Sequence, residues 1–170
     1  MSSNPDITSA KLSHVDLSGN PQMVDVSAKP VTQRSATAIA RVVLPAAAIQ
    51  TLAENGYMGG KHGSKGSIIH TAIIAGVLAA KRTSDLIPFC HLIALQACDI
   101  AIIANGTGFQ IECTCKCYAG TGVEMEALTG ATAAALCIYD MCKALSYDIV
   151  IQDIRLQHKT GGKSDFGTAR

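Results

Sequence analysis

The chain of 170 residues is long enough for one domain, and its 48% of hydrophobic residues can form a core, which excludes a wholly disordered chain. A formal net charge of +1 argues against a general nucleic-acid binder, and 4% of aromatic residues with no Trp argues against a stacking platform for single-stranded bases. Because only 16% of the residues are charged, we expect part of the apolar surface to be buried between subunits.

The N-terminal part is predicted to be a flexible arm over residues 1–22, since it is rich in Ser, Asn, Asp and Pro and has no apolar run. A single domain is predicted to follow over 23–170. Apolar and polar residues alternate at 23–28 and 37–43, which predicts two strands there.

The next segment is predicted to be helical. A proline opens a helix over 46–54 and Asn55-Gly56 ends it. Five glycines make 56–67 a loop, and a second helix covers 68–82. We expect 83–91 to be irregular, because its proline forbids helix.

The C-terminal half begins with a predicted hairpin of strands 94–104 and 109–118, joined by the turn Asn-Gly-Thr-Gly at 105–108. A long helix over 124–144 and a last strand over 148–157 follow. This order of elements predicts an α+β fold, with an antiparallel sheet and helices on one face.

Three of the seven cysteines, Cys113, Cys115 and Cys117, have the look of a metal motif. They alternate with polar residues, however, as in a half-buried strand where thiols act as small hydrophobes. Three thiols on one face of a strand are poorly placed around a tetrahedral ion, so we expect no metal site. Seven cysteines without a leader indicate a reducing compartment.

We expect no secretory leader, because the sequence does not open with basic residues followed by an apolar run. The apolar windows at 68–80 and 131–138 are shorter than the roughly 18 residues that span a bilayer. We therefore expect a soluble protein of the cytoplasm, or of an organelle matrix if a transit peptide has been removed.

A candidate anion site lies in the glycine-rich loop, where Lys61, His62 and Lys65 precede a predicted helix N-terminus. Backbone N–H groups and the helix dipole there favour a phosphate. The alternative is a solvated crossover loop.

A second candidate is Asp140 with Lys143, three residues apart on one helix face. They form either a structural pair or a site in which Asp140 orients Lys143. Crowding by other cations would lower the pKa of Lys143 towards a value useful for proton transfer.

Further candidates lie in the segment after the second helix and at the start of the long helix. Cys90 and His91 follow a proline, and adjacency alone does not make a Cys/His dyad. Glu124 and Glu126 fall in the first turn, where they either complement the helix dipole or accept N–H bonds from a guanine-like edge. Local basic clusters, with Arg34 and the tail 158–170, suit a compact polyanion rather than a nucleic-acid backbone.

Five stretches together closely resemble the MoaC family of cyclic pyranopterin monophosphate synthases, over nearly all of residues 12–166. They are MVDVSAKP at 23–30, KG at 65–66, IAGVLAAKRTSDLIPFCH at 74–91, TGVEMEALTGATAAALCIYDMCKAL at 121–145 and IRLQHKTGGKS at 154–164.

The resemblance implies a ferredoxin-like fold and a homohexamer, a trimer of dimers with active sites at subunit interfaces. It implies a lyase of molybdenum cofactor (molybdopterin) biosynthesis that converts (8S)-3′,8-cyclo-7,8-dihydroguanosine 5′-triphosphate to cyclic pyranopterin monophosphate and diphosphate. A radical S-adenosylmethionine GTP cyclase supplies that substrate. It implies that no cofactor is required, although Mg²⁺ could accompany the triphosphate. We expect neither nucleic acid nor a membrane as a partner.

The same resemblance implies the site residues. Those matching the catalytic positions of the family are Asp140, Lys65 and Lys143. Those matching its substrate-binding positions are Phe89, Cys90, His91, Met125 and Glu126, with anion contacts at Arg34, Lys159 and Lys163.

Three positions depart from the family pattern. Ser67 stands where the family usually has Asp, and Leu92 where it has Pro. Asp165 follows Ser164 directly, without the usual glycine between them, which affects how the tail would grip phosphates. Two other classes of function stay open: a lyase or cyclase acting on an ordinary nucleotide, and a non-catalytic oligomeric binding protein.

Overall fold

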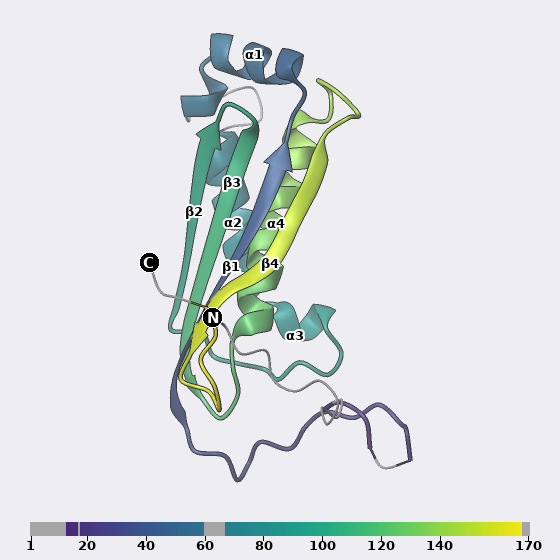
Figure 1. The fold of residues 1–170 in the computed structure, drawn as a ribbon, viewed down its shortest axis with the longest axis vertical. Coiled ribbons are helices and arrows are strands. Elements are labelled where there is room, and N and C mark those ends of the chain that lie inside the picture. The colour runs from purple at the N-terminus through teal and green to yellow at the C-terminus, as the bar shows by residue number, and fades with distance from the viewer. Residues whose placement is uncertain (1–12, 17, 60–66, 168–170) are drawn as a thin grey trace.

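A four-stranded antiparallel sheet is the centre of the protein, as seen in a computed structural model that describes residues 13–16, 18–59 and 67–167. Its strands, in the order β2-β3-β1-β4 across the sheet, are β1 (Thr32–Val43), β2 (Ala97–Asn105), β3 (Gly108–Ala119) and β4 (Val150–Thr160) (Figure 1).

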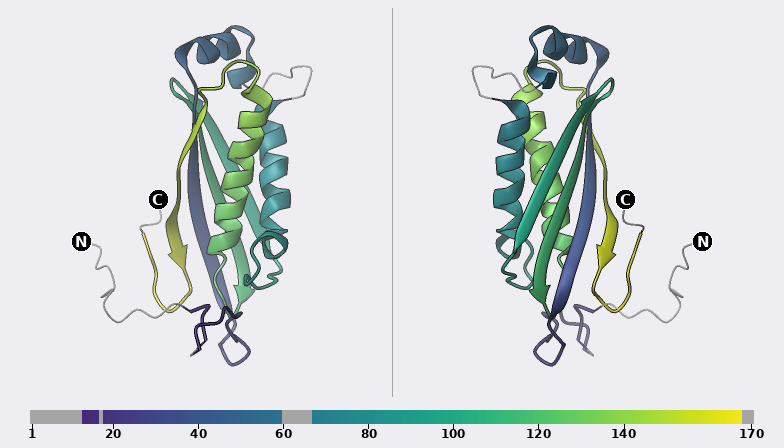
Figure 2. Two further views of the ribbon diagram at one scale, coloured as in Figure 1. Left: turned by 90° about the vertical axis from the view of Figure 1, so that its right-hand side faces the viewer. Right: turned by 90° about the vertical axis from the view of Figure 1, so that its left-hand side faces the viewer.

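Two long helices, α2 (Ile68–Ala80) and α4 (Glu124–Cys142), cover one face of this sheet (Figure 2). Of the shorter helices, α1 (Ala46–Glu54) and η2 (Tyr57–Gly59) lie at one end of the sheet, whereas α3 (Thr83–Leu86) lies beside the lower part of α4. The β-α-β-β-α-β order with this strand arrangement is ferredoxin-like, which confirms the predicted fold class. None of the helices in the described ranges has the length and hydropathy that a membrane span requires.

The predicted strand at 23–28 is wrong, because this segment forms a turn. The carboxylate of Asp25 accepts a hydrogen bond from the backbone N–H of Ser27 at 2.8 Å, and the N–H of Lys29 donates to the Val26 carbonyl at 3.0 Å. Such local bonds compete with pairing in a sheet. The strand predicted at 37–43 is confirmed, but it starts earlier than predicted, at Thr32, and is the first strand of the sheet.

The segment 83–91 is also more regular than predicted, since its first residues form α3. The Thr83 hydroxyl donates to the Ala80 carbonyl at 2.9 Å. The helix ends before Ile87, which is extended with ψ 104°, as expected of a residue that precedes a proline.

The predicted N-terminal arm lies partly outside the described residues. Within its described part, Val15 and Pro21 form an isolated antiparallel bridge.

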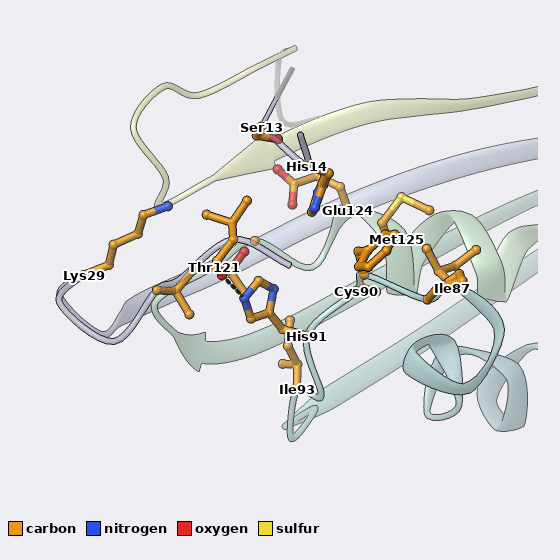
Figure 3. Close-up of a pocket in the computed structure, with 15 residues that line it drawn as sticks. Ser13, His14, Lys29, Ile87, Cys90, His91, Ile93, Thr121, Glu124 and Met125 are labelled. Atoms are coloured by element: carbon orange, nitrogen blue, oxygen red, sulfur yellow. Dashed lines mark hydrogen bonds between the residues drawn. The ribbon is translucent and has the colours of Figure 1, made fainter. Parts of the chain in front are cut away.

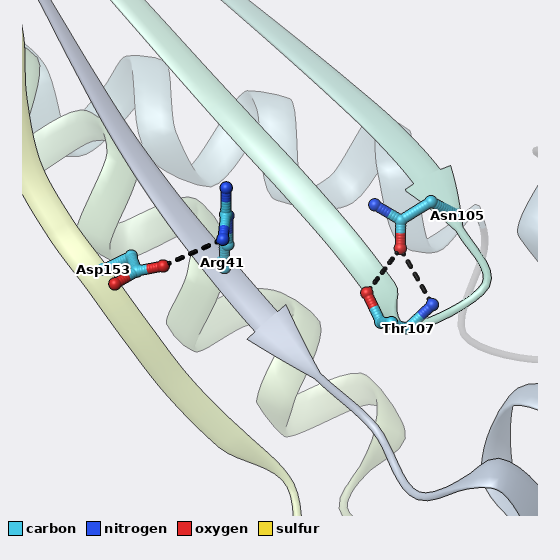
Figure 4. Close-up of polar contacts among 4 residues, drawn as sticks. All are labelled: Arg41, Asn105, Thr107 and Asp153. Carbon is cyan, nitrogen blue, oxygen red and sulfur yellow. Dashed lines mark hydrogen bonds and ion pairs between the residues drawn. The ribbon is translucent and has the colours of Figure 1, made fainter.

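The hairpin between β2 and β3 is confirmed, and it fixes the register of the two strands. The side-chain oxygen of Asn105 accepts from both the backbone N–H and the hydroxyl of Thr107, at 2.9 and 2.8 Å (Figure 4). Gly108 has φ +135°, and a Cβ at this position would lie 2.1 Å from the Val42 carbonyl oxygen. Only glycine fits at this position. The turn pairs Asn105 with Gly108, and this pair sets the partner on β3 of every other residue of β2.

The core lies between the sheet and the two long helices. Alternate side chains of β3 point into it, and Phe109, Ile111 and the three cysteines of this strand are almost fully buried. The helices approach closely at Gly76 and Gly130: a Cβ on Gly76 would lie 2.8 Å from the Gly130 carbonyl oxygen. The backbones of α2 and α4 therefore lie close together at this point.

Candidate active site

Two adjoining cavities lie where α4 begins, with volumes of about 600 and 230 Å³. Their walls share Lys29, Thr121, Gly122 and Glu124. The larger cavity alone has a volume typical of small-molecule sites. A ligand with two chemically different halves can therefore occupy both.

Segments far apart in the sequence line the larger cavity, as Figure 3 shows. The segment after Pro88 contributes Phe89, Cys90 and His91, and the first turn of α4 contributes Met125. Four of the residues matched to the substrate-binding positions of the family thus share one cavity.

The N-terminal segment forms another part of this wall. The His91 Nε2 donates to the Val24 carbonyl oxygen at 2.7 Å, so this nitrogen carries a hydrogen and, in the neutral ring, Nδ1 is an acceptor. The His14 ring stacks on Phe89 with centroids 6.4 Å apart. Sequence reasoning missed this contribution, because it predicted a flexible arm over 1–22 and a strand over 23–28.

Glu126 lies behind the larger cavity rather than in its wall. Its side chain is 2% exposed, and its Oε1 accepts a hydrogen bond from the Cys90 thiol at 3.7 Å. Its Oε2 is buried with no hydrogen-bond partner among the described groups. Burial raises the pKa of Glu126. The Glu126 carboxylate is therefore connected to the cavity by its hydrogen bond with Cys90, which lines the wall.

The Cys90 thiol is held in its neutral form. Burial and the nearby charge of Glu126 raise its pKa to about 11. Cys90 therefore serves as a weak hydrogen-bond donor in the cavity wall and is a poor nucleophile.

The smaller cavity is basic. Arg34, Lys159 and Lys163, all matched to anion contacts, line it together with Lys29, which sequence reasoning missed. The Arg34 Nε donates to the Ala119 carbonyl at 3.2 Å, which fixes the guanidinium. The Lys159 ammonium pairs with Glu124 Oε1 at 3.0 Å. The signal that could have found Lys29 was its place in MVDVSAKP, one of the stretches that carry the resemblance.

A tight turn after β4 presents Lys163 to this cavity. Gly161 has φ +82°, and a Cβ there would lie 1.8 Å from the Gln33 carbonyl oxygen. Its backbone N–H donates to the Asp165 carboxylate at 3.1 Å, and its carbonyl accepts from the Thr32 hydroxyl at 2.8 Å. Asp165, one of the departures from the family pattern, therefore closes the turn.

Asp140 and Lys143 form the predicted pair on one face of α4, with 2.6 Å between Oδ1 and Nζ. Both side chains are more than half exposed. The Asp140 carboxylate raises the pKa of Lys143, the opposite of the lowering expected from crowding by cations.

This pair lies far from the cavities of its own chain. Because an α-helix rises about 1.5 Å per residue, Glu124 and Asp140 are roughly 24 Å apart along α4. One protomer therefore does not bring Asp140 and Lys143 to the cavities.

Lys61, His62 and Lys65 of the predicted anion loop lie outside the described residues. Ser67, just beyond them, begins α2: its hydroxyl accepts from the backbone N–H of His70 at 3.3 Å and is almost fully buried. This departure from the family pattern thus acts as an N-cap, a role that both Ser and Asp perform. Leu92, another departure, is 85% exposed.

Comparisons with known proteins identify the family of the chain. The model of the MoaC family matches residues 23–162. A protein of Xanthomonas campestris named cyclic pyranopterin monophosphate synthase is 53% identical over 164 residues, which cover 96% of this chain and 97% of that protein. One of the same name from Parvibaculum lavamentivorans is 46% identical over 91% of this chain and 94% of its own length.

The human protein named molybdenum cofactor biosynthesis protein 1 is 45% identical over 98% of this chain, which covers 26% of the human protein. The family model and the bacterial relatives both extend over the strands and helices that form the two cavities. The chain belongs to the MoaC family.

Proposed function

We propose that the protein is a lyase of molybdenum cofactor biosynthesis that converts (8S)-3′,8-cyclo-7,8-dihydroguanosine 5′-triphosphate to cyclic pyranopterin monophosphate and diphosphate. The observation that carries this proposal is the pair of adjoining cavities, one basic and one largely apolar, with a shared wall at the start of α4. The name of the bacterial relatives, cyclic pyranopterin monophosphate synthase, supports formation of the same product.

The two cavities suit the two halves of this substrate. The triphosphate binds in the smaller cavity, where Lys29, Arg34, Lys159 and Lys163 neutralise its charge. The modified purine binds in the larger cavity, against Phe89 and the other residues of its wall. Glu124 stands at the boundary, so bound phosphates compete with its carboxylate for Lys159.

Proton transfer is assigned to Lys65, Asp140 and Lys143. Because Asp140 raises the pKa of Lys143, this lysine stays protonated and takes the role of general acid. The role of general base then falls to Lys65. Cations around the phosphates favour departure of diphosphate as the cyclic phosphate closes. These proton transfers and one displacement need no redox cofactor.

Asp140 and Lys143 act in the cavities of a neighbouring chain, so the active form is a homo-oligomer, a hexamer built as a trimer of dimers. The separation of roughly 24 Å along α4 supports this arrangement. Exposed apolar side chains close to the pair also support it, since Leu136 is 56% and Leu145 41% exposed. Such exposure next to an ion pair is typical of a surface that packs against another subunit.

The test is incubation of the purified protein with the cyclic GTP-derived triphosphate, with the pterin product and diphosphate measured together. We expect the two products in equal amounts, and none from GTP. Release of diphosphate from GTP itself would instead support a lyase acting on an ordinary nucleotide. Tight binding without turnover would support a binding protein.

A further inference from the structure

Three thiols from two strands meet on the helix-covered face of the sheet, in a place that the proposed reaction does not use. Cys98 of β2 is the register partner of Cys115 of β3, and Cys113 lies two residues along on the same face. Their sulfur atoms all lie within 4.8 Å of one another, and those of Cys113 and Cys115 are 4.0 Å apart.

The sulfur triangle has the size of a trigonal metal site. Sulfurs no more than 4.8 Å apart have a common centre within 4.8/√3, or about 2.8 Å, of each of them, against about 2.3 Å for a typical metal–thiolate bond. Three sulfurs at 2.3 Å in a plane are separated by about 4.0 Å, which is the spacing of Cys113 and Cys115. An ion would require each sulfur to move by about half an ångström or less.

The surroundings of the triangle fix two of its members and leave the third accessible. Cys113 and Cys115 are fully buried, and Gly130 of α4 packs so closely that a Cβ there would lie 2.7 Å from the Cys113 sulfur. Cys98 is only partly buried, since β2 is an edge strand, which gives an ion a route from solvent.

The ligand set selects the kind of ion. Thiolates prefer soft cations, and no fourth Cys, His, Asp or Glu joins this group within the described ranges. Zn²⁺ takes four ligands in a closed protein site, whereas Cu(I) is stable with three thiolates. We propose that Cys98, Cys113 and Cys115 form a trigonal site for a soft cation of the Cu(I) class. Each sulfur gives its proton to solvent as its bond to the metal forms, and no electron is transferred.

The test is an anaerobic titration of the reduced full-length protein with Cu(I), supplied as its acetonitrile complex in the presence of a competing Cu(I) chelator. We expect one ion per chain, with a copper absorption edge and fine structure that show three sulfur neighbours. Cys98→Ser should weaken binding at least tenfold. Cys137→Ser, which removes a partly buried thiol of α4 outside the triangle, should leave binding unchanged.

A second measurement does not depend on any variant. Cu(I) should protect Cys98 of the wild-type protein from alkylation, read residue by residue by mass spectrometry, while Cys137 stays as reactive as before. The proposal is overturned if Cys98→Ser binds as tightly as the wild type, if Cys98 is not protected, or if the bound ion has four ligands.

Discussion

Lys159 and Glu124 are joined by an ion pair of 3.0 Å across the boundary of the two cavities. The pair occupies the place where the phosphates would meet the basic wall. In the proposed complex, phosphate binding would therefore separate Lys159 from a carboxylate that repels the ligand. Gly122 leaves room for Glu124 in this position, because a Cβ at Gly122 would overlap the Glu124 carboxyl group, 1.9 Å from Oε2.

Glu124→Gln should bind inorganic triphosphate more tightly than the wild type. A partly exposed ion pair contributes about 1 kcal/mol at most, so we expect an increase of up to roughly fivefold in affinity. Isothermal titration calorimetry measures it. Glu54→Gln, on the distant helix α1, is the matched control and should change nothing. Weaker binding by Glu124→Gln would mean that Glu124 assists the phosphates.

Gly161→Ala should weaken triphosphate binding and lower the melting temperature. The backbone of Gly161 has φ +82°, and the added Cβ would clash with the Gln33 carbonyl oxygen, so the turn that carries Lys163 must change shape. We expect a loss of about 1–3 kcal/mol in stability. Gly106→Ala is the control, because a Cβ at that position has open space around it. Equal effects of the two substitutions would contradict this account.

Lys143→Ala should lower turnover by at least ~10²-fold while the oligomer stays intact, since a positioned acid or base contributes about 10²–10⁴-fold. Asp140→Asn should be milder and should change the pH dependence. Because Asp140 raises the pKa of Lys143, its removal lowers that pKa, and an acid is lost at lower pH. The alkaline limb of kcat against pH should therefore move to lower pH, and an unmoved limb would refute the assigned role.

Two inactive variants should restore activity when their chains are mixed. Arg34→Ala damages the basic cavity and Lys143→Ala damages the far end of α4, so a site shared between chains can combine one intact half from each. At equal mixing with random exchange, about a quarter of such sites are complete. Activity is measured before and after subunit exchange, which mass spectrometry verifies. No recovery after verified exchange would place the whole site in one chain.

Glu126→Gln should stabilise the protein at neutral pH. Burial raises the pKa of Glu126 above its ordinary value of 4.5, so the folded state holds this proton more strongly than the unfolded chain does. The wild type therefore loses stability as the pH rises from 4.5 through the folded-state pKa, and Gln cannot. The melting temperature of Glu126→Gln should exceed that of the wild type at pH 7, by a gap that narrows towards pH 4.5. A gap independent of pH would disprove this reading of Glu126.

Local chemistry made part of the fold predictable. The helix Ala46–Glu54 was predicted with its observed bounds because a proline precedes it and Asn55-Gly56 follows it. The hairpin was predictable from its turn residues, Asn-Gly-Thr-Gly at 105–108, which join Asn105 to Gly108. The segment 23–28 was not, because a single side-chain bond from Asp25 outweighed its alternating pattern.

The site was predictable in its residue types but not in its geometry. Sequence spacing placed Asp140 and Lys143 together, but it carried no information on their distance from the cavities, which depends on the whole length of α4. The meeting of Cys98 with Cys115 follows from the hairpin register, since Asn105 pairs with Gly108. The C-x-C-x-C pattern of β3 does not reveal this cluster, because its third thiol, Cys98, comes from the neighbouring strand β2.

The close packing of Gly76 against Gly130 has a consequence for how neighbouring chains influence one another. With its middle held by this contact, α4 behaves as a stiff rod between the nucleotide-sized hollow at Glu124 and the ion pair at Asp140. A shift at one end would then move the other end as well, because the helix would tilt as a whole. In the proposed oligomer, occupancy of one hollow would thereby reorient the lysine that the same chain is proposed to contribute to its neighbour.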